Sequence, residues 1–559
     1  MSVIESTLTN AIQKVVKQLG FPLEGEEIIL EIPRDEQHGD LATNVAMRLA
    51  SQLKQPPLSI AQKITSELEK SLHPSVIARV EAKAPGFINF SLSPQILYQA
   101  IPVILHEKER YGSSDFSKAE PVLLEFVSAN PTGALSVAHG RQAAVGDSLA
   151  NILEFAGFKV SREYYLNNVG NQMNLLAQSI FVRYRELLGE KLSLPEGGYK
   201  GSYIGDIARG ILTREGDRWR EWNEQAKDHF LKIGVETILT GIRKDLEFFG
   251  VHFDSWFSQE ELEKSGDVQG VLQQLKEKGF VYEQDKALWF KSTAFGDDKD
   301  RVVIKSDGSF TYLAPDIAYH RDKLSRGYKK LINLWGPDHH GYIPRLRAAI
   351  QSLGYPADTL VVLIVQLTTL YEGKRQLKMS TREGEFVTLL EVTEVVGRDA
   401  ARFFFLMRKV DAHLDFDLEL AKLQTVENPV YYIQYAYARI CSIREFAQKE
   451  GIGQYDQDQF TPHPQTNFEY LQTPEEVKIL KILRQFPTTV QICSQLYEPF
   501  YLTLYLQRLA ESFHQFYHQH RVVTEDAGLS QARLALVEAV RIVIANGLKL
   551  LGVSTPEKM

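Results

Sequence analysis

The sequence predicts an α/β protein in three parts: a mixed α/β unit, a central unit built on a parallel sheet, and a bundle of helices. Three observations lead to this prediction. At 559 residues the chain is too long for a single core. Residues 121–188 alternate strand, helix, strand and helix, and right-handed crossovers turn this order into a parallel sheet. Beyond about Glu391 the apolar spacing is helical throughout.

The composition is that of a soluble globular protein, with 44% apolar and 24% charged residues. Cys441 and Cys493 cannot form a disulfide framework, which indicates a reducing, cytoplasmic setting. The first twenty residues lack the features of a signal peptide, and the most apolar run, Leu360–Leu370, is too short to span a bilayer. We therefore expect no membrane partner. The net charge of −8 neither indicates nor excludes nucleic acid, because an acidic body can carry a local basic surface.

Residues 1 to about 115 form the first unit. Helical patterns are followed by short strands, and the expected elements are helices at Val3–Leu19, Leu41–Leu53 and Ser59–Leu68 and a strand at Gly86–Leu92. Asp40 precedes one of these helical patterns and is a plausible N-cap. We interpret His38 and Asp40 as a capping and turn network and not as catalytic residues.

The central unit begins with a strand, a tight loop and a helix. The strand is Val122–Val127, the loop holds Asn130, Pro131 and Gly133, and the helical pattern starts near His139. Unpaired N–H groups at such a helix start attract anions, so this stretch predicts a phosphate site. A second strand follows at Lys159–Leu166.

An insertion is expected at about residues 186–295, where glycines mark irregular chain before charged helices. From about residue 301 the sheet is expected to resume, with strands at Arg301–Lys305, Lys330–Leu334 and Leu360–Leu367. The last strand leads into a basic loop. The helical part then holds about five bundle helices. Its amphipathic segments are Asp399–Arg408, Pro429–Gly451, Thr473–Ser494, Tyr501–His520 and Gln531–Leu551, with a surface loop at 451–467.

Two segments could contact a polyphosphate. The imidazole of His139 stands near a helix start, where it could donate to phosphate oxygens, although a cap or packing role explains it as well. The stretch Lys374–Gly384 carries several cations on a turn-rich loop. Such a loop could close on phosphates, and an ordinary solvated basic loop is the alternative.

Two further segments carry acidic and imidazole groups. In YLAPDIAYH, Asp316 stands near a strand end, where it could pair with a planar guanidinium or simply match the helix dipole. In GPDHHGY, the residues Asp338, His339 and His340 suggest a metal site. Adjacent histidines rarely share one ion, and no cysteine lies nearby, so we predict no metal-binding residues here.

Taken together and in order, these motifs resemble the arginyl-tRNA synthetase family of the class I aminoacyl-tRNA synthetases. EFVSANPTGALSVAHGR resembles the first class signature, and KMSTR resembles the second. HGDLATNVAMRLA looks like the family's N-terminal domain, and NPVYYIQYAYARICSI and VRIVIANGLKLLGVSTPEKM look like its anticodon-binding helices. The resemblance implies a tRNA-contacting domain at 1–115, a Rossmann-type catalytic domain at 116–390, a junction at 391–428 and an anticodon-binding domain at 429–559.

The resemblance also implies roles for individual residues. Glu125 and Asn130 would hold the ammonium end of arginine, Asp316 would face its guanidinium, Tyr312 would wall the pocket and His340 would add a polar contact. ATP would meet Gly133, Ser136, His139, Gly140, Lys378, Met379 and Ser380. The catalytic groups among these would be Ser136, His139, Lys378 and Ser380, joined by Arg382 over the pyrophosphate. Contacts to tRNA would involve Tyr431, Tyr435, Asn89 and Phe90.

The implied activity is ATP-dependent ligation of arginine to tRNA(Arg), with Mg²⁺ accompanying the ATP phosphates and the chain acting as a monomer. Three positions depart from the family pattern. Ser136 replaces the first signature histidine, Ala138 replaces a glycine, and Thr381 replaces a lysine. These departures motivate an alternative, a catalytically impaired tRNA-binding paralogue. A third reading, a class I synthetase for another amino acid such as cysteine, lacks the cysteines of a zinc-held thiol pocket.

Overall fold

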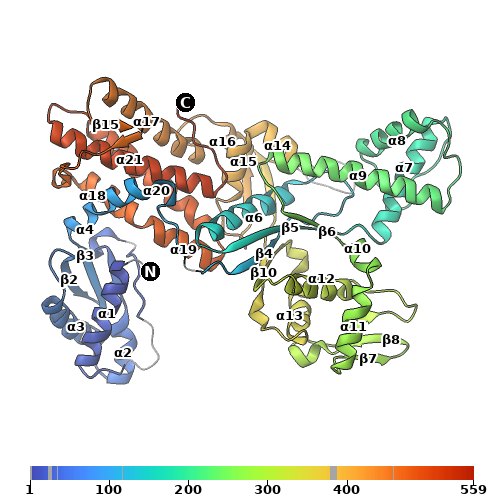
Figure 1. Cartoon of the computed structure of the whole chain (residues 1–559), viewed down its shortest axis with the longest axis horizontal. Coiled ribbons are helices and arrows are strands. Elements are labelled where there is room, and N and C mark those ends of the chain that lie inside the picture. The colour runs from blue at the N-terminus through green and yellow to red at the C-terminus, as the bar shows by residue number, and fades with distance from the viewer. Residues whose placement is uncertain (1–2, 23–27, 34, 116, 378–386, 457–458) are drawn as a thin grey trace.

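The computed structural model describes residues 3–22, 28–33, 35–115, 117–377, 387–456 and 459–559. The molecule is elongated (Figure 1). The N-terminal unit and the C-terminal helices lie at one end, the helices of the insertion lie at the other, and the parallel sheet lies between them. No helix among the residues described above is long and apolar enough to cross a membrane.

The N-terminal unit is a three-stranded antiparallel sheet covered by helices. Its elements are α1 (Val3–Gln18), η1 (Glu36–His38), β1 (Leu41–Thr43), α2 (Val45–Leu53), α3 (Pro57–Ser71), β2 (Ile77–Lys83) and β3 (Phe87–Leu92), with strand order β1-β3-β2. The expected helix at Leu41–Leu53 is wrong at its start, because residues 41–43 pair with β3. Asp40 is therefore not an N-cap. Its carboxylate accepts from the Leu92 amide at 2.7 Å and pairs with Lys481 at 2.8 Å.

The segment after β3 belongs to the helical end of the molecule. It forms α4 (Pro94–Tyr98), α5 (Ala100–Glu107) and η2 (Lys108–Arg110). The Tyr98 hydroxyl donates to the Leu471 carbonyl at 3.1 Å, and the Tyr111 hydroxyl donates to the Leu483 carbonyl at 3.0 Å. Residues 94–111 thus tie the N-terminal unit to the bundle.

The central sheet is parallel, as the sequence predicts. Its strands are β4 (Pro121–Glu125), β5 (Lys159–Leu166), β6 (Ser255–Ser258), β10 (Lys330–Trp335) and β11 (Leu360–Ile364), in the order β11-β10-β4-β5-β6. Its associated helical segments are α6 (Val137–Phe155), α12 (Leu313–Ser325), η4 (Pro337–Tyr342), α13 (Ile343–Ser352) and η5 (Ala357–Thr359). The strand order reverses at β4, which is where open α/β sheets bind ligands.

The chain between β5 and β10, which includes the predicted insertion at about 186–295, is more varied than expected. It holds α7 (Asn171–Leu187), α8 (Ser202–Glu215), α9 (Glu224–Phe248), α10 (Gln259–Lys264), α11 (Asp267–Glu277), β7 (Val281–Gln284), β8 (Ala287–Phe290), η3 (Ser292–Phe295) and β9 (Arg301–Ile304). Two expectations are wrong here. The segment predicted as an insertion contributes β6 to the central sheet, and β9 pairs with β8 in a separate antiparallel sheet instead of resuming the central one.

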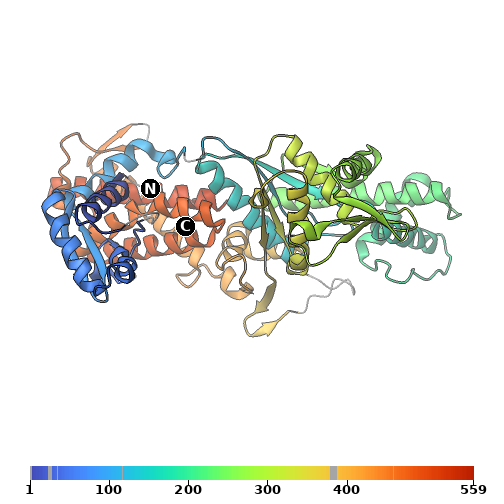
Figure 2. The ribbon, with the colours of Figure 1, turned by 90° about the horizontal axis from the view of Figure 1, so that it is seen from below.

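A small sheet follows the central one. Its strands are β12 (Thr368–Glu372), β13 (Arg375–Gln376) and β14 (Leu414–Asp417), and the helices beside it are α14 (Leu389–Val396), α15 (Arg398–Phe405) and α16 (Leu418–Lys422). The chain beyond Glu391 is therefore not entirely helical, because β14 pairs in parallel with β12. Figure 2 shows the β12–β13 hairpin projecting from the body of the molecule.

Among the described residues, the bundle holds five α-helices. They are α17 (Pro429–Lys449), α18 (Pro474–Arg484), α19 (Phe486–Leu496), α20 (Phe500–Gln519) and α21 (Ala527–Leu550), with η6 (Phe468–Tyr470) before α18. The number equals the predicted one, but the predicted segment Asp399–Arg408 is α15, outside the bundle, and the predicted segment Thr473–Ser494 divides into two helices at Gln485. The expected surface loop at 451–467 contains the paired strands β15 (Gln454–Asp456) and β16 (Gln459–Thr461).

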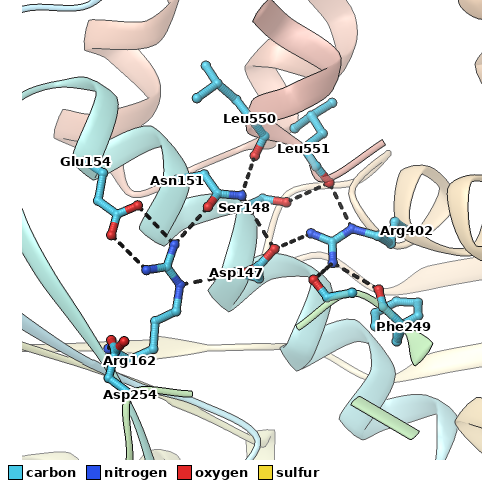
Figure 3. Close-up of polar contacts among 11 residues, drawn as sticks. Asp147, Ser148, Asn151, Glu154, Arg162, Phe249, Asp254, Arg402, Leu550 and Leu551 are labelled. Carbon is cyan, nitrogen blue, oxygen red and sulfur yellow. Dashed lines mark hydrogen bonds and ion pairs between the residues drawn. The ribbon is translucent and has the colours of Figure 1, made fainter. Parts of the chain in front are cut away.

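The end of α21 is seated against α6 of the catalytic unit (Figure 3). Arg402, fully buried on α15, donates to the Asp147 carboxylate at 2.5 Å and to the Leu551 carbonyl at 3.0 Å. Asn151 donates to the Leu550 carbonyl at 3.3 Å. The last carbonyls of α21 thus find donors on α6 of the central unit and on α15 of the chain that follows it, which packs the bundle firmly against the central unit.

Candidate active site

The predicted substrate residues gather at the carboxyl ends of β4 and β10. Glu125 is the last residue of β4, and Asp316 lies in the first turn of α12. The Tyr342 hydroxyl, at the end of η4, donates to Asp316 Oδ2 at 2.6 Å. Two carboxylates from different elements therefore face one region of the strand-order switch.

The Asp316 carboxyl is half-buried, and its environment makes ionisation harder. Burial raises its pKa to about 6, and the negative charge of Glu125 adds to the rise. The hydrogen bond from Tyr342 and the charge of Lys323 act in the opposite direction. A cation that paired with Asp316 would remove the penalty that burial imposes on the carboxylate.

Glu125 is almost completely buried, with 6% of its surface exposed. Lys323 Nζ, which is fully buried, lies 2.5 Å from Glu125 Oε2, and Ser128 Oγ donates to Oε1 at 3.2 Å. Ser128 and the preceding Val127 have φ of 41° and 66°. A β-branched residue such as Val127 is strained in the left-handed region. The strained turn at Val127 and Ser128 directs the Ser128 hydroxyl toward the Glu125 carboxylate.

The other predicted arginine contacts are less closely assembled. Asn130 Nδ2 donates to Gln172 Oε1 at 2.7 Å, so it joins the amide-rich loop that starts α7. The Tyr312 side chain is 77% exposed and does not wall the pocket in this conformation. His340 is exposed on η4, the turn that also carries Tyr342. The predicted roles of these three residues stay predictions.

Ser136 and His139 form a reciprocal contact at the start of α6. The Ser136 backbone N–H donates to His139 Nδ1 at 3.1 Å, and Ser136 Oγ also lies 3.1 Å from Nδ1. Burial lowers the pKa of His139 to about 4, so the ring is neutral at pH 7. Because Nδ1 accepts from the backbone, the ring proton lies on Nε2, which can donate to an anion.

The remaining ATP-site predictions fall on glycines or outside the described residues. A Cβ on Gly140 would collide with Leu389, so this glycine permits close packing of α6 against α14. Gly133 borders a cavity of about 750 Å³ that α8 and α9 line, and that cavity contains neither acidic substrate residue. Lys378, Met379, Ser380 and Arg382 lie outside the described residues, as does Thr381.

Arg141 links α6 to the chain that leads into the β12–β13 hairpin. It is fully buried, and its guanidinium donates to the carbonyls of Gln366 and Ala412 at 2.9 Å and of Lys409 at 2.8 Å. Two segments more than 200 residues away in sequence are thereby fixed next to His139.

The predicted tRNA contacts divide into two kinds. Tyr431 and Tyr435 are half-buried on α17 with nearly parallel rings, 6.3 Å between centroids. Stacked aromatics of this kind can receive unpaired bases. Asn89 and Phe90 instead lie on β3, with 6% and 0% of their surface exposed. The structure does not support a tRNA contact by either side chain, because both belong to the core of the N-terminal unit.

Three residues of the site were not found from the sequence. Tyr342 lies in the segment that suggested a metal site, Lys323 follows Asp316 by two helical turns, and Asn333 is a polar residue within an apolar strand. Of these three, only Asn333 could have been suspected from the sequence, because an amide side chain in a buried strand needs a hydrogen-bond partner. Within the described ranges, no three His, Cys, Asp or Glu residues gather as a metal site would require.

Comparisons with known proteins agree with this arrangement. Residues 100–409 match the family described as tRNA synthetases class I (R), catalytic domain. Residues 3–92 match the arginyl tRNA synthetase N terminal domain, and residues 433–559 match the DALR anticodon binding domain.

The similarity to named proteins covers almost the whole chain. An arginine–tRNA ligase of Geobacillus kaustophilus is 48% identical over 95% of this chain and 94% of its own length. One of Bacillus subtilis is 46% identical over 100% of this chain and 99% of its own. A solved Thermus thermophilus arginyl-tRNA synthetase, 23% identical, superposes with a TM-score of 0.75 over 99% of this chain and 100% of its own, which supports the fold.

Proposed function

Because this chain belongs to the arginyl-tRNA synthetase family and is an arginine–tRNA ligase, we propose that the two carboxylates at the β4–α12 edge select its amino acid. The observation that carries the proposal is Asp316, half-buried with a raised pKa beside buried Glu125. A planar guanidinium satisfies a buried carboxylate with two parallel hydrogen bonds, which a lysine ammonium cannot do. Tyr312 would close over the bound side chain, while Asn130 and His340 would contact its polar end.

ATP is the second substrate, and its phosphates would lie at the start of α6. His139 Nε2 would donate to a phosphate oxygen from a neutral ring, with Ser136 and the backbone at Gly133 and Gly140 beside it. Lys378, Met379, Ser380 and Arg382 would add the facing contacts. In-line attack of the arginine carboxylate on the α-phosphorus needs positioning and anion stabilisation more than an acid or a base.

Mg²⁺ would arrive with ATP. The described residues offer no cluster that could form a dedicated cage, and Mg²⁺ generally keeps several waters beside phosphate oxygens. Bound in this way, the ion would supply charge neutralisation of the phosphates. The protein's own part would be to hold ATP and arginine in line.

The bundle at 429–559 would read tRNA(Arg), with the Tyr431–Tyr435 pair as a candidate base platform. The N-terminal unit at 1–115 would contact tRNA through its exposed surface and not through Asn89 or Phe90. We further propose that the enzyme acts as a monomer in the cytoplasm. No observation on the described residues favours the impaired paralogue, because the Ser136 backbone already directs the His139 ring.

Aminoacylation of tRNA(Arg) with arginine, lysine, citrulline and canavanine tests the proposal. We expect charging with arginine and far weaker use of citrulline, whose neutral ureido group cannot form the ion pair. Equal use of citrulline and arginine would contradict the assignment of Asp316. Absence of charging with arginine at every Mg²⁺ and ATP concentration would contradict the activity itself.

A further inference from the structure

A chain of buried polar side chains runs beneath the two carboxylates of the pocket. It starts at Lys323, whose Nζ lies 2.5 Å from Glu125 Oε2 and 3.2 Å from Asn333 Oδ1. The same ammonium lies over the ring of Tyr319, 4.1 Å from its centroid. A fully buried lysine is costly unless each of its protons has a partner, and here three partners surround it.

This row of hydrogen bonds continues to the backbone carbonyl of Asp316, the residue that carries the second carboxylate. Asn333 Nδ2 lies 3.1 Å from His320 Nε2, and His320 Nδ1 lies 2.8 Å from the Asp316 carbonyl. Because a carbonyl can only accept, Nδ1 carries the ring proton and Nε2 accepts from the amide. His320 is therefore neutral, in agreement with the strong lowering of its pKa by burial. Asn333 thus accepts from Lys323 and donates to His320, and His320 donates to the Asp316 carbonyl, so the hydrogen bonds have a single direction from Lys323 to Asp316.

This geometry fixes both the position and the charge of the pocket. The chain connects β4 through β10 to α12, so it sets the separation of Glu125 and Asp316. It also places one ammonium against Glu125 and within electrostatic reach of Asp316, so these three groups together carry one net negative charge, opposite to the single net positive charge of arginine. Without the ammonium, two carboxylates would share a poorly solvated site, and one of them would take up a proton.

We propose that Lys323, together with Asn333 and His320, is a positioning device that keeps both carboxylates of the arginine pocket ionised and correctly spaced. Lys323 is buried and acts through Glu125 and Asp316. The inference rests on the proposed arginine pocket. It assigns to Lys323 the role of determining how many protons the two carboxylates release when arginine binds.

The test uses Lys323→Met, which keeps the length of the side chain and removes its charge. Isothermal titration calorimetry of the full-length enzyme with arginine, in two buffers of different ionisation enthalpy, counts the protons released. At about pH 7.5 we expect almost no release from the natural enzyme and up to about one proton from Lys323→Met, because the second carboxylate then binds a proton that arginine displaces. Arginine affinity of the variant should fall about ten-fold per pH unit below its new pKa.

The groups that could titrate around the two carboxylates are few. They are Lys323, His320 and Tyr319 from α12, Glu163 and Tyr165 from β5 and Tyr342 from η4. Glu163 pairs with Arg326 at 2.6 Å, and its hydrogen bonds keep its pKa lowered in spite of burial, so it stays ionised. Burial raises the pKa values of the three tyrosines well above 10. They stay neutral across the assay range, so a released proton reports on the carboxylates.

A double variant keeps the proposal testable if Lys323→Met folds poorly. Removing both members of a buried ion pair is far less disruptive than removing one, so Glu125→Gln with Lys323→Met should fold. It leaves Asp316 as the single charge of the three groups. Arginine should bind more weakly because the Glu125 contact is lost, while the proton release should return to the natural value. Asn333→Leu keeps the ion pair and should weaken arginine binding with no added proton release.

The control is Arg533→Met, which breaks a comparably buried pair, Arg533 Nε to Glu476 Oε1 at 2.7 Å, inside the bundle. It should leave arginine affinity and proton release unchanged. Unchanged proton release in Lys323→Met would overturn the inference, as would equal losses of arginine affinity in Lys323→Met and Arg533→Met. Failure of the natural enzyme to bind arginine would instead contradict the proposed function, so the two failures are distinguishable.

Discussion

Burial acts in opposite directions on the two titratable residues at the centre of the site. It raises the pKa of Asp316 to about 6 and lowers the pKa of His139 to about 4. At pH 7 the first is mostly ionised and the second is neutral, so both are in the state that their proposed partners require. Arginine needs a carboxylate, and a phosphate oxygen needs an N–H donor.

The affinity for arginine should therefore depend on pH between 5 and 8, whereas His139 should stay neutral over the same range. As the pH falls through about 6, Asp316 takes up a proton and its ion pair with the guanidinium is lost, so the affinity should decrease. Calorimetric titration with arginine between pH 5 and 8 checks this. Asp316→Asn should flatten the pH profile and weaken arginine binding by roughly 2–3 kcal/mol, with ATP binding little changed. A pH profile that Asp316→Asn leaves unaltered would count against the assignment.

His139 and Ser136 should differ in their contribution to ATP use. Removal of the imidazole by His139→Ala should cost on the order of 3 kcal/mol in the activation barrier, the effect of losing one positioned donor. Ser136→Ala should cost much less, because the backbone N–H that directs the ring stays in place. Rates of ATP–pyrophosphate exchange, measured in the presence of tRNA(Arg), compare the two. Equal losses would mean that the serine hydroxyl itself contacts ATP.

At the scale of elements, long periodic segments were predictable and short paired strands were not. The helix α6 and the strand β4 follow from apolar spacing alone, and the bundle helices α17, α20 and α21 were each expected as one segment, whereas α18 and α19 were expected as a single one. β6 and β14, four residues each, exist because distant strands pair with them. No local pattern of four residues carries that information.

The contact between α6, α15 and α21 should be the most sensitive point of packing outside the site. Arg402→Met leaves the mostly buried Asp147 without its closest cation, and such a loss typically costs about 3–5 kcal/mol of unfolding free energy. Arg398→Met, four residues away with 47% of its side chain exposed, should cost less than about 1 kcal/mol. Urea denaturation of both variants gives the comparison. Similar midpoints for the two would show that the buried pair contributes little.

At the scale of the whole molecule, the catalytic unit and the bundle should unfold together. The end of α21 receives hydrogen bonds from Arg402 and Asn151, and the Arg533–Glu476 pair stabilises the bundle internally. Differential scanning calorimetry should show one transition for both units. A chain ended after about Lys422 should lose tRNA charging and stability together, because α6 and α15 become exposed. A truncated chain that melts at the natural temperature would contradict this coupling.

The same scale explains which parts of the site were predictable. The carboxylates Glu125 and Asp316 could be located because the family resemblance assigns a role to each, and the position of Asp316 near a strand end pointed to the same role. Tyr342 reaches Asp316 from η4, and Lys323 reaches Glu125 from α12, so both contacts form only after the sheet is assembled. The burial of Asn89 and Phe90 likewise follows from the pairing of β3 between β1 and β2, which a position in a motif does not reveal.

The seat of α21 on α6 also bears on how the protein is made. Leu551 is synthesised 149 residues after Arg402, the side chain whose guanidinium it receives. While the ribosome is still adding the bundle, the finished catalytic unit holds that guanidinium without its last acceptor, on a helix packed directly against α6. The part of α6 that carries Asp147, Ser148 and Asn151 therefore gains its contacts with α21 only after Leu551 has been made and has left the ribosome, so a chain released before that residue would lack this part of the packing.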